Sequence, residues 1–154
     1  MNFKTTILLL TLFFISSLSF SQTLHAYWMK DLNFGDTFIG YSREILDQDD
    51  EAAEFLIFHT SSSKRDLLIN FDLPGNLTNG LSKLPIIFYR RHASWAYDVD
   101  GRRRQFNPHS PLERRRVRNS TQLYLWLGGK IEAYNNNLSP GSYSGTIILT
   151  VEYL

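Results

Sequence analysis

Apolar and polar residues alternate along much of the chain. The clearest case is Asp66–Leu73, where apolar side chains occupy every second position. A period of two places these side chains on one face of a β-strand. Further runs rich in apolar, aromatic and β-branched residues predict strands at Glu54–Thr60, Leu84–Arg91, Trp95–Val99, Thr121–Leu127, Lys130–Tyr134 and Tyr143–Leu154. Only Asp47–Ala53 could form a helical turn, and its acidic residues suit a solvated loop equally well.

The predicted strands are short, and turn residues separate them about every ten positions. This arrangement is typical of a β-sandwich or a barrel. The chain has no repeat of fixed period and no interdomain linker. We therefore expect an all-β protein with one domain.

The first 21 residues have the pattern of a secretory signal peptide. Lys4 gives a positive start, Ile7–Ile15 is apolar except for one threonine, and Ser19 and Ser21 suit cleavage before Gln22. The alternative, an N-terminal membrane anchor, is disfavoured because the apolar stretch is short and no basic cluster follows it. The expected product is a single β-sandwich domain, residues 22–154, without a membrane span. It would be exported to the periplasm, the cell surface or an extracellular fibre.

The amino-acid composition excludes several classes of protein. None of the 154 residues is a cysteine, which excludes a disulfide scaffold, a zinc ribbon and a thiol enzyme. Loss of the first 21 residues leaves 15 basic and 15 acidic side chains, so the expected product has no net formal charge. A chain of this length can bury enough surface to be held by its core alone.

The C-terminal segment carries the most specific pattern. Tyr153 is the penultimate residue, and Val151, Leu149 and Ile147 precede it at steps of two. Gly141 is the fourteenth residue from the end. This spacing predicts a turn followed by a long strand with one apolar face. A strand at the end of a chain often lies at a sheet edge, where its free backbone groups can pair with another strand.

These residues resemble the C-terminal strand of chaperone–usher pilus subunits. In that family the strand has a glycine fourteen places from the end, alternating apolar residues and a penultimate tyrosine. Three other segments resemble the spore-coat-U type relatives of these subunits: Leu32–Gly35 (LNFG), Leu127–Lys130 (LGGK) and Pro140–Thr146 (PGSYSGT). The resemblance spans most of residues 30–154.

The resemblance implies an immunoglobulin-like sandwich that lacks one strand. Its partners would be a periplasmic chaperone and neighbouring fibre subunits, whose strands would fill the groove by β-augmentation. Gly141, Ile147, Leu149, Val151 and Tyr153 would then pair with the partner strand. Many pilins have a disulfide, which this chain cannot form. The segment Gln22–Asp31 fits either a brief donor strand or a lengthened first strand.

An arginine-rich segment is the second unusual feature. Residues 86–120 contain nine arginines and three acidic residues, and glycine and proline mark Gly101–Asn119 as a loop anchored by Phe106. Such a patch could bind an anionic glycan, a phosphate or an anionic lipid. Alternatively, the loop is solvated or pairs with the acidic residues at 47–54. The candidate anion-binding residues are Arg102, Arg103, Arg104, Arg114, Arg115 and Arg116.

No catalytic pattern is recognisable. The four histidines are far apart in sequence and have no metal-ligand spacing, and no nucleophile elbow, phosphate loop or calcium loop occurs. No nucleic-acid motif accompanies the arginines, so nucleic-acid binding is not expected. We therefore predict no enzyme, metal or cofactor. The first hypothesis is a structural or adhesive fibre subunit, and the alternative is a self-contained secreted module that binds an anionic glycan or another surface ligand.

Overall fold

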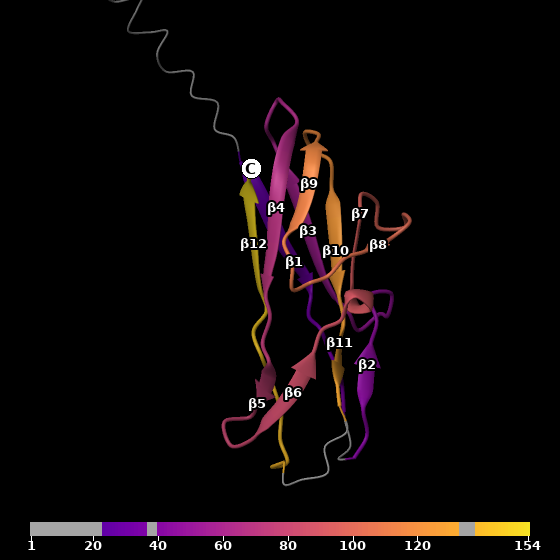
Figure 1. The fold of residues 1–154 in the computed structure, drawn as a ribbon, viewed down its shortest axis with the longest axis vertical. Coiled ribbons are helices and arrows are strands. Elements are labelled where there is room, and N and C mark those ends of the chain that lie inside the picture. The colour runs from indigo at the N-terminus through magenta and orange to yellow at the C-terminus, as the bar shows by residue number, and fades with distance from the viewer. Residues whose placement is uncertain (1–22, 37–39, 133–137) are drawn as a thin grey trace, which may run out of the picture.

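The computed structural model describes residues 23–36, 40–132 and 138–154 (Figure 1). The predicted signal peptide lies outside these residues. The described elements are strands apart from one short 3-10 helix: β1 Leu24–Lys30, β2 Arg43–Ile45, β3 Ala53–His59, β4 Arg65–Asp72, β5 Asn76–Thr78, β6 Lys83–Ile87, η1 Arg90–His92, β7 Ala93–Ala96, β8 Arg104–Gln105, β9 Leu112–Val117, β10 Leu123–Leu127, β11 Gly129–Ile131 and β12 Ile148–Tyr153. The expected all-β class is confirmed.

The strands form three antiparallel sheets. Five strands pair in the order β1-β3-β10-β7-β8, four in the order β2-β11-β6-β5, and three in the order β12-β4-β9. The strand β12 therefore ends one sheet, and β1 ends another. In Figure 1 both lie on the same side of the molecule, and the start of β1 lies near the C-terminus.

One apolar core joins the sheets. The side chains of β3 are alternately buried and half-buried, as the period of a strand requires. Phe55 of the five-stranded sheet packs edge-on against Phe71 of the three-stranded sheet, with ring centroids 5.5 Å apart. Ile45, Ile86 and Ile131 extend the same core into the four-stranded sheet. This packing of sheets across a shared core is consistent with a β-sandwich.

Gly128 carries the chain from β10 into β11, and so from one sheet to the next. Its N–H donates a hydrogen bond of 2.7 Å to the carbonyl of His92. A Cβ atom here would lie 2.0 Å from the carbonyl oxygen of Ile45. The backbone of β2 therefore approaches so closely that only glycine fits.

The strands predicted at Glu54–Thr60, Asp66–Leu73 and Thr121–Leu127 are confirmed as β3, β4 and β10. Two other strands end earlier than predicted. The strand predicted at 84–91 ends at Ile87, and the one at 95–99 ends at Ala96, where the chain turns through a bond from the Gly101 N–H to the Asp98 carbonyl.

Three further interpretations need correction or a limit. The LNFG segment, which resembles an early strand of the spore-coat-U type relatives, is not a strand here, because Gly35 turns the chain with a φ of +58° while Phe34 is buried. Residues 47–52 form turns and bends, which agrees with the loop alternative and not with a helical turn, and Ala53 already belongs to β3. The strand predicted at 130–134 is seen only at Gly129–Ile131, and residues 133–137 lie outside the described part.

The prediction of a loop from Gly101 to Asn119 was wrong. This segment contains β8, which pairs with β7, and β9, which pairs with β4. Phe106 is buried between them, as expected. The prediction relied on Gly101, Pro108 and Pro111, but these residues lie outside the two strands and leave room for both. In the described residues, no helix is long and apolar enough to cross a bilayer.

Candidate functional site: a groove between two edge strands

An open groove separates β1 from β12. Its upper part has a volume of about 570 Å³ and is lined by Ala26–Trp28, Lys30–Leu32, Ala53, Phe55 and residues 145–149. Its lower part, of about 770 Å³, continues between residues 31–36 and residues 141–147. The two parts share Asp31, Leu32, Gly145 and Ile147, so they form one continuous groove.

Each wall of the groove is the last strand of its sheet. In the described structure, β1 pairs only with β3, and β12 pairs only with β4. The far side of each strand therefore has backbone N–H and C=O groups without a strand partner. Such a row of groups can pair with an added strand.

The apolar side chains of β12 face the core. Leu149, Val151 and Tyr153 lie opposite Phe71, Ile69 and Leu67 of β4. All three β12 residues are half-buried, whereas Ile148, Thr150 and Glu152 are exposed on the other face. The predicted alternation is thus confirmed for this strand. Of its core-facing residues, Leu149 lines the groove, and Val151 and Tyr153 lie beyond it.

The strand β12 is shorter than the predicted Tyr143–Leu154. Residues 143–147 run beside another segment of the same polypeptide and pair with it through one isolated bridge, between Ser144 and Thr78. A Cβ atom on Gly145 would lie 2.9 Å from the side chain of Leu77, so the two segments approach closely there. Ile147 is half-buried against the core and lines both parts of the groove.

Gly141 lies at the far end of the groove. Its φ of +147° belongs to the region that favours glycine, and the Asn79 side chain lies 3.3 Å from the position of a Cβ atom. Gly141, Ile147 and Leu149 line this wall, whereas Val151 and Tyr153 lie further along β12, beyond the residues that line the groove. Of the five residues proposed for strand pairing, the groove therefore brings three together.

Sequence reasoning missed the importance of Trp28. In the register of β1 with β3, Trp28 lies opposite Phe55, which is a core residue. It therefore belongs to the core-facing side of β1, yet it remains 65% exposed. Ala26, on the same side of the strand, is exposed as well. The alternation of Leu24, Ala26 and Trp28 could have drawn attention to this face, but it carries no information on what covers it.

The segment Gln22–Asp31 supplies a strand of this chain's own sheet. Within it, β1 pairs with β3 from Leu24 to Lys30, with one irregularity near Trp28. The outer face of β1 carries His25 and Tyr27, which stack with Phe58 of β3 at centroid distances of 4.7 and 5.8 Å. The lengthened first strand is therefore the arrangement seen, and the other interpretation, a donor strand, has no counterpart in this structure.

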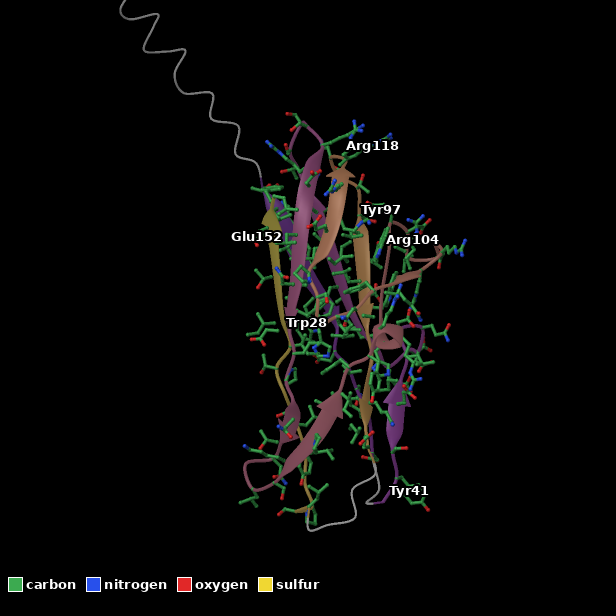
Figure 2. The ribbon with its side chains drawn as sticks, in the orientation of Figure 1. Trp28, Tyr41, Tyr97, Arg104, Arg118 and Glu152 are labelled. Carbon is green, nitrogen blue, oxygen red and sulfur yellow. The ribbon has the colours of Figure 1, made fainter. Side chains whose placement is uncertain are left out.

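The arginines of the predicted anion patch lie on two stretches of the structure that meet at the Trp95 ring, which both Arg104 and Arg114 contact. Arg104 belongs to β8, and Arg102 and Arg103 lead into it, at the opposite end of the five-stranded sheet from β1. Arg114, Arg115 and Arg116 lie on β9 of the three-stranded sheet. Figure 2 shows Arg104 and Glu152 on opposite sides of the molecule.

The arginines of β9 have individual structural partners. Arg114 stacks over Trp95 at 3.6 Å and donates a hydrogen bond of 2.9 Å to the Tyr97 hydroxyl. Arg115 pairs with Glu113 at 3.5 Å. At Arg116 it is the backbone N–H that donates to the Asp66 carboxylate, at 2.6 Å. These contacts stabilise the sheet edge without forming a common pocket.

The buried histidines have structural roles. His59 hydrogen-bonds with the Val117 carbonyl and with the Ser61 N–H. The His92 Nδ1 accepts from the Tyr89 N–H, so its Nε2 donates to Glu44, 2.7 Å away. In the residues that the structure describes, no group of three histidine and acidic side chains could hold a metal ion.

Glu44 connects β2 to the 3-10 helix η1. It accepts from His92 and also pairs with Arg91 at 2.6 Å. The hydrogen bond from His92 lowers the pKa of Glu44, Arg91 lowers it further, and partial burial opposes both effects. The carboxylate therefore stays ionised and holds η1 in place.

Comparison with family models, with curated proteins and with solved structures finds no match to this chain.

Proposed function

We propose that the protein is an exported fibre subunit with an immunoglobulin-like sandwich that is completed by a strand from another polypeptide. That strand would come from a periplasmic chaperone and then from a neighbouring subunit. The proposal includes removal of residues 1–21 as a signal peptide and a location in the periplasm or in a surface fibre. One observation carries it: Trp28 lies on the core-facing side of a strand but is 65% exposed.

The groove has the chemistry that strand addition requires. Both walls supply free backbone groups, and the core-facing residues Leu149, Val151 and Tyr153 are still half-buried. An inserted strand would pair its backbone with the walls and place every second side chain over the core. From Gly141 to Leu149 the lined wall is long enough for a partner segment of about nine residues.

Chain assembly tests the proposal. The full gene is expressed in a bacterium that exports the protein, and the recovered protein is sized and examined for bound polypeptides. Ile147→Asp and Leu149→Asp should abolish polymer formation and co-purification, since each places a charged group on the groove wall. Thr150→Asp is the matched control, because Thr150 is exposed on the outer face.

A synthetic strand gives a second readout. A peptide of about 12 residues that alternates valine with threonine should bind the wild-type protein and raise its unfolding temperature. A wild-type protein that is a stable monomer and binds no such peptide would contradict the proposal. The self-contained binding module for an anionic glycan would then become the better hypothesis.

A further inference from the structure

A basic pocket lies at the opposite edge of the five-stranded sheet from the groove. It has a volume of about 970 Å³ and lies between the turn after β2, the helix η1 and the segment that leads into β8. Its lining includes five guanidinium groups and a single carboxylate, that of Asp47. The arginines are Arg90, Arg91, Arg102, Arg103 and Arg104.

Two of these arginines are held by the protein itself. Arg103 stacks over the Trp126 ring at 3.8 Å and donates a hydrogen bond to the Asp47 carbonyl. Arg91 is fixed by its ion pair with Glu44. Because these side chains are already ordered, a ligand would bind to a largely preformed surface.

The other three arginines carry charge that the protein leaves uncompensated. Arg90, Arg102 and Arg104 are exposed, and among the described residues none of the three forms an ion pair with a carboxylate. Arg104 lies over the Trp95 ring at 5.2 Å, a contact that leaves its charge in place. Three positive charges around one pocket repel each other, and a bound anion would relieve this repulsion.

We propose that this pocket binds a ligand with at least two sulfate or phosphate groups. The planar guanidinium group donates two parallel hydrogen bonds to such oxyanions, which favours arginine over lysine in sites of this kind. A ligand with only one carboxylate would leave most of the positive charge of the pocket unpaired. The acidic groups could be carried by a saccharide or by a lipid headgroup. The proposal does not depend on strand addition, since the pocket and the groove are at opposite edges of the sheet.

Titration of the purified full-length gene product with pyrophosphate tests the proposal. Two triple variants remove the same charge. The pocket variant is Arg90→Gln, Arg102→Gln and Arg104→Gln, and the control variant is Lys83→Gln, Arg115→Gln and Arg118→Gln, all at exposed positions. The pocket variant should bind about tenfold more weakly or worse, because it loses charge-assisted hydrogen bonds. The control should change the affinity by less than about twofold, because distant exposed charges are screened.

Two further probes identify the source of the acidic groups. A heparin fragment tests a sulfated saccharide, and vesicles of cardiolipin in phosphatidylcholine test a lipid headgroup, because the cardiolipin headgroup carries two phosphates. Selective loss of binding by the pocket variant to either probe supports the site and names its ligand class. Absence of binding to all three probes, or an equal loss in both variants, would overturn the proposal. If the pocket variant does not fold, the single change Arg102→Glu must show the same selective loss.

Discussion

Replacing Trp28 by alanine should weaken the binding of an added strand. It should leave the stability of the domain without that strand almost unchanged. A tryptophan side chain exposes about 250 Å² when fully accessible. With 65% of Trp28 exposed, on the order of 150 Å² is in contact with water in the free protein. An inserted strand that covers half of this area would gain about 2 kcal/mol at ~25 cal/mol per Å².

Loss of that contact should weaken binding of the alternating valine–threonine peptide about thirtyfold. Anisotropy of a dye-labelled peptide measures the affinity, and urea unfolding measures the stability of the free protein through Trp95 and Trp126. The free energy of unfolding should fall by less than about 1 kcal/mol, since Trp28 buries little surface before the strand binds.

His25→Ala is the matched control. His25 lies on the outer face of β1 in contact with Phe58, and it does not line the groove. Its removal should leave the peptide affinity within about twofold of wild type. Equal affinities for wild type and Trp28→Ala, or equal losses for the two variants, would refute the argument that Trp28 faces an acceptor groove.

Two further predictions concern the framework around the sites. Gly128→Ala should lower the free energy of unfolding by about 3 kcal/mol or more, because the new methyl group would meet the backbone of β2. Gly75→Ala, where no atom lies within 4 Å of the added Cβ, should have a much smaller effect in the same urea titration. Glu44 should make stability depend on acid pH. Its pKa is lower in the folded state than its ordinary value of 4.5, so its contribution is present above about pH 4.5 and is lost as pH falls through the folded-state pKa. The Glu44→Gln variant should therefore lose less stability than wild type between pH 5 and pH 3. Parallel profiles of stability against pH for the two proteins would show that the His92 contact does not make stability depend on acid pH.

The strand pattern could be predicted where one face of a strand is buried by its own chain. In β3 and β4 the alternation of side chains follows the core directly, so the predicted and observed strands agree within one residue. Strand ends were less predictable because they depend on distant contacts. Residues 143–147 are one example, because they pair with the distant Thr78 through a single isolated bridge and form no regular strand.

The contacts of the arginine-rich segment could not be predicted from the sequence for a different reason. Its glycine and prolines predicted a loop over Gly101–Asn119, but Trp95 and Trp126 provide aromatic faces on which Arg114 and Arg103 stack. Such pairs join residues far apart in sequence, so no local pattern shows them. The same contacts divide the six predicted arginines between a sheet edge and a pocket. Arg90 and Arg91, which complete the pocket, come from η1 and were not assigned to the patch.

The groove depends on sheet order more than on any local motif. The apolar stripe of β12 would have the same spacing in a closed sandwich, where a neighbouring strand would cover it. Here β12 and β1 each end a sheet and face one another across the groove. Their apolar residues were visible in the sequence, but the exposure of Trp28 follows only from the pairing of β1 with β3. Since a closed sandwich would bury this side chain, its 65% exposure is the feature that favours completion by a second polypeptide over a self-contained module.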